Sequence, residues 1–83
     1  MYKKVNKKQA RKLFLQRYDI YLLPCKVNLQ NMWIKPCIIS IVNKENGKAR
    51  DVDFDKLVNE YEYYNCNYNE LGKYASYYIK EVE

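Results

Sequence analysis

Two segments of this 83-residue chain have apolar residues at helical spacing, and both are short. They cover residues 6–17 and 53–65. An isolated helix of this length is marginal in water, so each must pack its apolar side against another element. The segments between and after them have the composition of strands. We therefore expect an α+β domain in which a sheet supplies the surface that both helices cover.

The strand-like segments differ in how strongly they are indicated. The run CIISIVN is the most apolar and is typical of a central strand buried on both faces. Asn46-Gly47 is a strong hairpin signal, and it predicts a return strand after it. The chain is expected to form one domain, residues 1–83, with the order α-β-β-β-α-β, an antiparallel sheet and the helices packed on one face. The expected strands are 18–23, 37–43, 48–52 and 73–82.

Both helices have recognisable starts. Asn6 and Gln9 have the spacing of a capping box, and Asp53 is a suitable N-cap with Asp55 in the first turn. The first apolar stripe is expected to include the stem of Arg17. The stripes consist of Ala10, Leu13, Phe14 and Arg17 in the first helix, and Phe54, Leu57, Val58, Tyr61 and Tyr64 in the second.

Positive charge is concentrated in the first half of the chain. The net charge is +5, and residues 1–42 carry nine lysines and arginines against Asp19 alone. Lysines at the start of a helix oppose its dipole, so an anionic partner would explain them. AT-rich codons are an alternative explanation of the lysine total. The predicted partner-binding basic face consists of Lys4, Lys7, Lys8, Arg11 and Lys12.

The chain lacks the residues that most enzymes use for catalysis. The chain has no histidine and no glycine-rich phosphate loop. Cys25, Cys37 and Cys66 are too widely spaced for a zinc site and are expected to be reduced, small buried groups. Asp51, Asp53 and Asp55 are better explained as a helix start than as a calcium loop. The sequence predicts no enzyme, no catalytic residue, no metal and no cofactor.

Aromatic residues supply the second set of candidate contacts. Trp33 lies between a turn-like segment and Pro36, where it either caps the core or anchors a protein partner. Tyr74 and Tyr78 share one face of the last predicted strand with Lys80, and Tyr63 lies off the apolar stripe of its helix. The alternative to a binding role is that the tyrosines take the place of phenylalanine in a core that is partly exposed to solvent. The predicted aromatic contacts are Trp33, Tyr63, Tyr68, Tyr74 and Tyr78.

No apolar run is long enough to span a bilayer, and no secretory signal is expected. These features predict a cytoplasmic protein that does not bind a membrane.

Three segments carry a resemblance: YLLPCK (21–26), NMWIKP (31–36) and residues 54–79. They resemble small uncharacterised proteins of phages and mobile elements from low-GC Gram-positive bacteria, over about two thirds of the chain. The stretch around Asn46-Gly47 departs from that pattern. The resemblance implies an anti-defence role of the anti-CRISPR type, in which a small protein occludes a host protein or ribonucleoprotein.

The expected function is therefore a non-enzymatic inhibitor that binds a host defence protein or ribonucleoprotein. Many anti-CRISPR proteins are acidic DNA mimics, whereas this chain is basic and suits guide RNA or an acidic protein patch. The alternative is a nucleic-acid-binding accessory or regulatory protein that uses the basic helix and tyrosines. A weaker alternative is sequestration of an anionic nucleotide signal.

Overall fold

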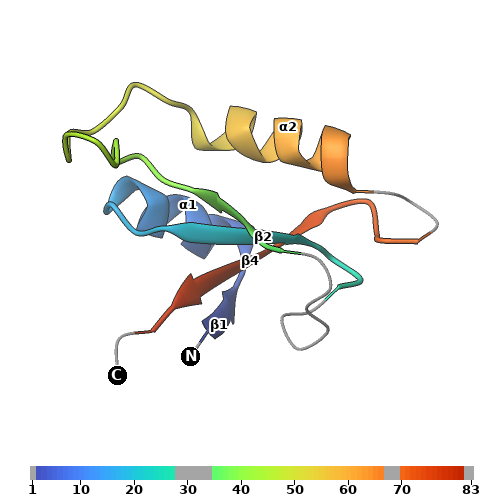
Figure 1. Cartoon of the computed structure of the whole chain (residues 1–83). Coiled ribbons are helices and arrows are strands. Elements are labelled where there is room, and N and C mark those ends of the chain that lie inside the picture. The colour runs from blue at the N-terminus through green and yellow to red at the C-terminus, as the bar shows by residue number, and fades with distance from the viewer. Residues whose placement is uncertain (1, 28–34, 67–69, 82–83) are drawn as a thin grey trace.

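The computed structural model describes residues 2–27, 35–66 and 70–81. These form a four-stranded antiparallel sheet and two helices (Figure 1). The structure confirms the α+β class. An additional strand precedes the first helix, and the expected return strand is reduced to a single bridge between Val42 and Ala49. The elements are β1 (Tyr2–Val5), α1 (Lys7–Leu15), β2 (Ile20–Pro24), β3 (Cys37–Ile39), α2 (Phe54–Asn65) and β4 (Ala75–Lys80).

The last strand lies inside the sheet. The strand order is β1-β4-β2-β3, and every neighbouring pair is antiparallel. The strands β1 and β2 therefore run parallel to each other on either side of β4, and α1 connects them. Likewise β3 and β4 run parallel on either side of β2, and α2 connects them. The two β-α-β connections interleave, so the sheet is complete only when β4 is in place.

Capping fixes where α1 begins. The Asn6 side chain accepts a hydrogen bond from the Gln9 N–H at 2.8 Å, and the Gln9 side chain accepts one from the Asn6 N–H at 3.1 Å. This is the predicted capping box, and it satisfies two free donors of the helix start. Ala10 and Phe14 are buried, as the periodicity predicted. Arg17 lies beyond the helix end, so its assignment to the apolar stripe was wrong.

The helix α2 begins at the predicted cap. The Asp53 side chain accepts a hydrogen bond from the Asp55 N–H at 3.0 Å. Phe54, Val58 and Tyr61 are buried against the sheet. Tyr64, however, is 79% exposed. Its position in the stripe was wrong because the buried line of α2 runs through Phe54, Val58 and Tyr61, and Tyr64 lies to one side of that line.

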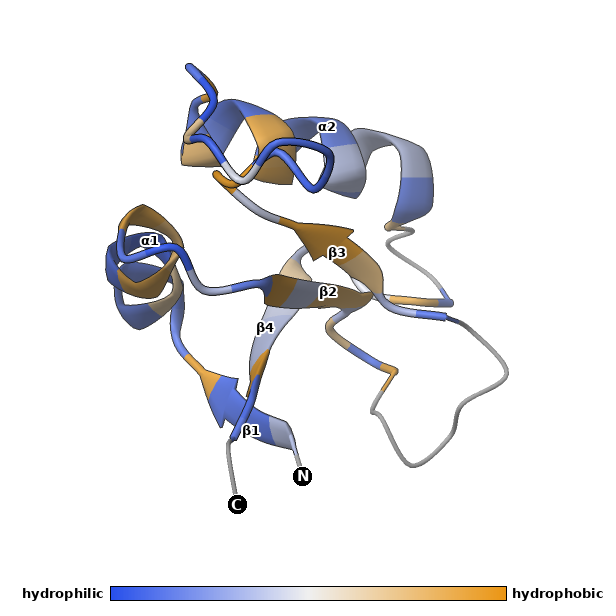
Figure 2. Cartoon of the chain, turned by 60° about the vertical axis from the view of Figure 1, so that its left-hand side comes forward, coloured by the Kyte–Doolittle hydropathy of each residue, from blue (hydrophilic) through white to orange (hydrophobic). Residues whose placement is uncertain are grey.

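The main core lies between the helices and one face of the sheet. Ile20 and Leu22 from β2 and Ala75 and Tyr77 from β4 pack with residues of both helices in one cluster. The ring centroids of Phe14 and Phe54 are 5.4 Å apart, and those of Phe54 and Tyr77 are 6.2 Å apart. Both helices therefore cover the same face, as predicted (Figure 2).

The strand predicted to be central is an edge strand. Within the run 37–43 only Cys37–Ile39 is a strand, and it pairs with β2 alone among the described strands. Ile38 is 53% exposed. The prediction failed because β2 and β4 hold the centre. Cys25 and Cys37 are also exposed, which contradicts their predicted burial, while Cys66 is half-buried.

The segment after β3 turns at the predicted glycine. Gly47 has φ +71, and its N–H donates to the Asn43 carbonyl at 2.8 Å. The chain then returns, with the Asn43 N–H donating to the Lys48 carbonyl. Only one bridge forms, so this is a tight turn rather than a hairpin of two strands. No helix within the described residues is long and apolar enough to cross a membrane.

Gly72 is the position at which a side chain fits least well. It has φ +99, and an added Cβ would lie 2.2 Å from the Cys25 sulfur. We predict that Gly72→Ala lowers the free energy of unfolding by about 3 kcal/mol, because strain and overpacking add. Gly47→Ala is the matched control. Its φ is also positive, but its Cβ would meet open space, so the cost should be about 1 kcal/mol. Urea unfolding measures both.

A further substitution tests the cause. Cys25→Ala removes the atom in conflict, so it should recover part of the stability lost in Gly72→Ala. Equal destabilisation by the two glycine substitutions, or no recovery in the double variant, would contradict the close packing of Gly72 against Cys25.

We also predict that stability falls as pH rises from about 9 to 12. Burial, with a contribution from Glu62, raises the pKa of Cys66 to about 11 and that of Tyr77 to about 12. Burial also raises the pKa of Tyr61 and Tyr78. At these pH values the unfolded chain releases protons that the folded chain retains, so folding is disfavoured. Urea unfolding across this range, with tyrosinate absorbance, measures the effect; constant stability up to pH 11 would contradict it.

Candidate binding surface

The exposed side of α1 presents lysines in one stripe. Lys8 and Lys12 are four residues apart and both are exposed, whereas Ala10 and Phe14 face the core. Residues at this spacing are neighbours on a helix surface. In the part of the chain that the structure describes, neither lysine forms an ion pair. Their charges are therefore available to an external anion.

Two of the predicted contact residues are instead used within the fold. The Arg11 guanidinium donates to Asp55 Oδ1 at 2.6 Å, and Lys7 Nζ lies 4.0 Å from the same oxygen. The Arg11 guanidinium also lies 5.7 Å from the centre of the Phe54 ring. The hydrogen bond that Arg11 donates to Asp55 raises the pKa of Arg11. These contacts join α1 to α2, so Arg11 is a structural residue that sequence periodicity alone could not distinguish from its neighbours.

Lys4 is separated from the other predicted basic residues. It belongs to β1 and pairs in register with Tyr78 of β4. Alternation along the strand directs it to the face of the sheet that the helices do not cover, because Val5 faces the core. The prediction that Lys4 belongs to the helix face was wrong, since the chain before Asn6 is extended.

Arg17 ends α1 in an unusual backbone conformation. The Tyr18 N–H donates to the Leu13 carbonyl at 3.0 Å, and the Arg17 N–H donates to the Phe14 carbonyl at 3.1 Å. This is a Schellman motif, in which the left-handed position normally holds glycine. Arg17 occupies it with φ +74. The chain thus carries a strained, exposed arginine where glycine would fit better.

Sequence reasoning missed two further exposed residues near the end of α1, Leu15 and Tyr18. Leu15 lies three residues after Lys12, and it and Tyr18 are exposed. The signal was present in the spacing, since Lys8, Lys12 and Leu15 follow an i, i+4, i+7 pattern. We refer to this set as the α1 surface, which consists of Lys8, Lys12, Leu15, Arg17 and Tyr18.

The predicted aromatic contacts do not form one cluster. Trp33 and Tyr68 lie outside the described residues. Tyr63 is 81% exposed and forms an edge-to-face pair with Tyr64, with ring centroids 4.9 Å apart. Tyr74 is exposed before β4, with the Lys73 ammonium 5.1 Å from its ring centre.

Tyr78 was expected at the surface together with Tyr74. It is on the predicted face of β4, but it is only 8% exposed. It packs with Leu23 and Val27 in a second, smaller core cluster. The prediction that its ring is a free contact was wrong, because residues that follow the central strands cover it.

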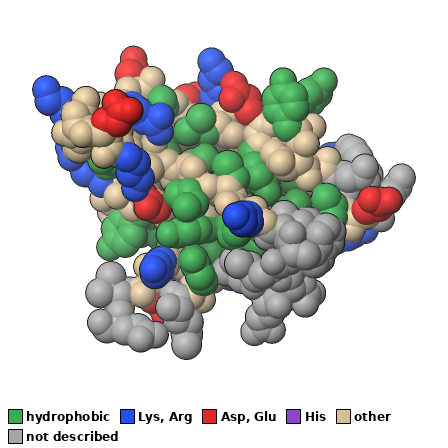
Figure 3. Space-filling model, in the orientation of Figure 1, with side chains coloured by type: hydrophobic (Ala, Val, Ile, Leu, Met, Phe, Trp, Pro, Cys, Tyr) green, Lys and Arg blue, Asp and Glu red, His purple; other side chains and the backbone are tan. Residues whose placement is uncertain are grey.

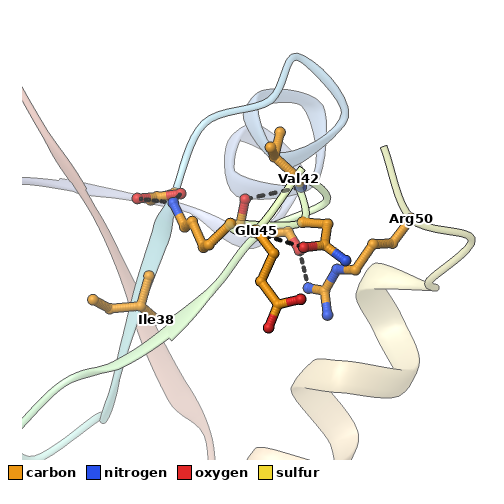
Figure 4. Close-up of a pocket in the computed structure, with 8 residues that line it drawn as sticks. Ile38, Val42, Glu45 and Arg50 are labelled. Atoms are coloured by element: carbon orange, nitrogen blue, oxygen red, sulfur yellow. Dashed lines mark hydrogen bonds and ion pairs between the residues drawn. The ribbon is translucent and has the colours of Figure 1, made fainter. Parts of the chain in front are cut away.

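A depression of about 700 Å³ lies beside β3 (Figure 4). Its cations already have partners: Lys44 Nζ lies 2.8 and 3.0 Å from the Asp19 carboxylate oxygens, and Arg50 donates to the Ser40 carbonyl. The Ser40 hydroxyl accepts from the Val42 N–H at 3.0 Å. Because Lys44 is paired with Asp19 and Glu45 is also in the lining, the depression offers little to an anionic ligand.

Apolar side chains gather on the side formed by β3 and α2 (Figure 3). Ile41, Val52 and Leu57 are half-buried against the main core, whereas the register of β3 with β2 directs the exposed Ile38 to the opposite face of the sheet. No cluster of three or more histidine, cysteine or acidic side chains suited to a metal occurs among the residues described. The Asp53 carboxylate is engaged as a helix cap, as predicted.

Comparison of the chain with protein-family models, curated proteins and solved structures found no match. The functional argument therefore depends on the chemistry of these surfaces. Among them, the α1 surface has unpaired charge, exposed apolar groups and local strain together.

Arg17→Gly tests whether this strain is real. Glycine adopts the left-handed conformation without steric cost, so the variant should gain about 1 kcal/mol in free energy of unfolding. Arg17→Ala, which keeps a Cβ, is the control and should not gain. Urea unfolding of both variants measures the difference. If Arg17→Gly were no more stable than Arg17→Ala, the backbone of residue 17 would not be strained.

Proposed function

We propose that this protein is a non-enzymatic binding module that occludes an anionic protein or ribonucleoprotein of a bacterial host, and that the α1 surface is its contact. One observation carries the proposal. Lys8, Lys12 and Arg17 present three cations without ion-pair partners among the described residues, whereas Lys7 and Arg11 are held by Asp55. Lys7 and Arg11 therefore stabilise the contact between the helices, whereas Lys8, Lys12 and Arg17 face solvent.

The α1 surface also departs from what stability alone would favour. No acidic residue lies in the first turn of α1, although negative charge is preferred there. Arg17 occupies a glycine position. Local departures of this kind are expected at functional sites, where binding rather than folding determines the residue.

The nature of the partner follows from charge. Three cations next to Leu15 and Tyr18 suit a surface that combines phosphates or carboxylates with apolar groups. The resemblance to phage and mobile-element proteins supports a host defence complex as the target, in the host cytoplasm. A non-enzymatic role is supported by the described carboxylates that the fold itself uses: Asp53 caps α2, Asp55 binds Arg11, and Glu62 accepts from the Ala75 N–H at 2.9 Å.

The alternative is a nucleic-acid-binding accessory or regulatory protein. The observation that favours it is Lys4 and Lys80 on the same sheet face as Tyr2 and Tyr21. Sequestration of a nucleotide signal is less favoured, because in the depression beside β3 Lys44 is paired with Asp19 and the carboxylate of Glu45 is also in the lining.

We predict that the triple variant Lys8→Ala, Lys12→Ala, Arg17→Ala loses at least tenfold in recovery of its partner from a host lysate. The control triple variant is Lys35→Ala, Lys48→Ala, Lys56→Ala, which removes the same charge from exposed positions elsewhere. Both should melt close to the wild type, because solvated charges contribute little to stability. The measurement is affinity capture with each tagged protein, with and without nuclease.

Recovery of one protein complex that resists nuclease, and that only the α1 triple variant loses, supports the proposal. Equal recovery with both triple variants would contradict the α1 surface as the contact. Loss of every partner on nuclease treatment would favour the nucleic-acid alternative.

A further inference from the structure

The sheet face that the helices leave uncovered has an ordered arrangement of aromatic and basic residues. The register aligns Lys4, Tyr78, Tyr21 and Ile38 across all four strands. The next row pairs Tyr2 with Lys80. Neither helix covers this face, because both pack on the other side of the sheet (Figure 1 and Figure 2).

One half of this face is closed and the other is open. Leu23, Val27 and Tyr78 are buried there, with Tyr21 and Leu71 packed against them. Towards the other end, Tyr2 is 40% exposed and Tyr21 is half-buried. Their rings meet edge to face, with centroids 5.0 Å apart. Buried Tyr78 lies in register between Lys4 and Tyr21 and forms the floor of this open half.

The charge on the open half is positive. Lys4 and Lys80 are both exposed. Lys80 pairs in register with Tyr2, and Lys4 is in the same row as Tyr21 with Tyr78 between them. Asp19, which precedes β2, has its carboxylate held by Lys44 at 2.8 Å. An anion approaching Tyr2 and Tyr21 therefore meets two ammonium groups, while the nearby Asp19 is already neutralised.

We propose that this open half-face binds a single-stranded nucleic acid, with Tyr2 and Tyr21 stacking on bases and Lys4 and Lys80 contacting phosphates. We refer to these four residues as the sheet platform. Stacking on exposed aromatic rings beside a basic track is how single strands are held without sequence readout. A duplex fits less well because its base faces are covered. This inference rests on the anionic partner proposed above, and it specifies that the partner includes exposed single-stranded RNA or DNA.

Lysines on an edge strand also have an explanation that involves no ligand. Lysines on an edge strand such as β1 discourage pairing with other chains. That role explains Lys3 and Lys4, but it does not explain Lys80, which is on the central strand β4, or the paired tyrosines. It also predicts no affinity for nucleic acid, so a binding experiment separates the two explanations.

The experiment is fluorescence anisotropy with a labelled oligouridylate, its oligothymidylate counterpart and a duplex of equal length, at several salt concentrations. The full-length wild type should prefer both single strands to the duplex. Tyr2→Leu should weaken single-strand binding roughly 5- to 100-fold, whereas Tyr2→Phe, which keeps the ring, should stay within about twofold. Lys4→Ala and Lys80→Ala should each reduce the salt slope by about 0.7.

Tyr63→Leu is the matched control. It removes a tyrosine of α2 that is more exposed than Tyr2, and its binding should equal that of the wild type because Tyr63 lies outside the platform. Loss of affinity in Tyr63→Leu as great as in Tyr2→Leu, equal affinity for the duplex, or no measurable binding of either single strand would overturn the platform.

The α1 triple variant separates this inference from the proposed function. Oligonucleotide binding that needs Lys8, Lys12 and Arg17 but not Tyr2 would overturn the platform and leave the proposed α1 contact standing. Binding that needs Tyr2 and Lys80 but not the α1 triple supports the platform. Binding confined to an acidic protein, with none to oligonucleotides, would overturn the platform alone.

Discussion

The insertion of β4 between β1 and β2 is the pairing on which the other features depend. Its register with β2, Tyr21 with Tyr78 and Leu22 with Tyr77, sets which residues face the helices and which face away. Tyr77 then contributes to the main core, and Tyr78 becomes the floor of the opposite face. Because a shift of one residue would exchange these faces, the core and the sheet platform are specified by the same hydrogen bonds. Neither can form before the last strand is in place.

A single carboxylate divides the basic residues of the N-terminal half into two groups. Asp55 holds Arg11 at 2.6 Å and lies 4.0 Å from Lys7, and so joins α1 to α2. Lys8 and Lys12, only one position along the helix, are left to solvent. Lys4 is directed to the other face by β1. The basic residues are close together in the sequence, but the fold separates them into three groups. Lys7 and Arg11 join the helices, Lys8 and Lys12 belong to the α1 surface, and Lys4 belongs to the sheet platform.

Local signals predicted the helices well and the sheet poorly. Asn6, Gln9 and Asp53 cap their helices as expected, since capping depends on residues three or fewer positions apart. β1 was not predicted because Tyr2–Val5 contains two lysines. Lysines suit an edge strand, but they make the segment too polar to be recognised as a strand from its composition. The apolar run around Ile38 predicts a central strand. The prediction failed because apolarity alone does not specify which strands lie beside a given strand. Lys7, Arg11 and Phe14 have i, i+4, i+7 spacing, so Lys7 and Arg11 flank the buried stripe, but only the long-range approach of Asp55 shows that they pair within the fold.

The sheet platform, rather than the apolar side formed by β3 and α2, is expected to meet a single-stranded nucleic acid. Chemical-shift mapping by NMR, with isotope-labelled protein titrated with oligouridylate, tests it residue by residue. We expect the backbone amides of Tyr2, Lys4, Tyr21 and Lys80 to shift together, with little change near Lys8, Lys12, Tyr63 or Lys44. Shifts confined to β3, α2 and the loop around Lys44 would contradict it.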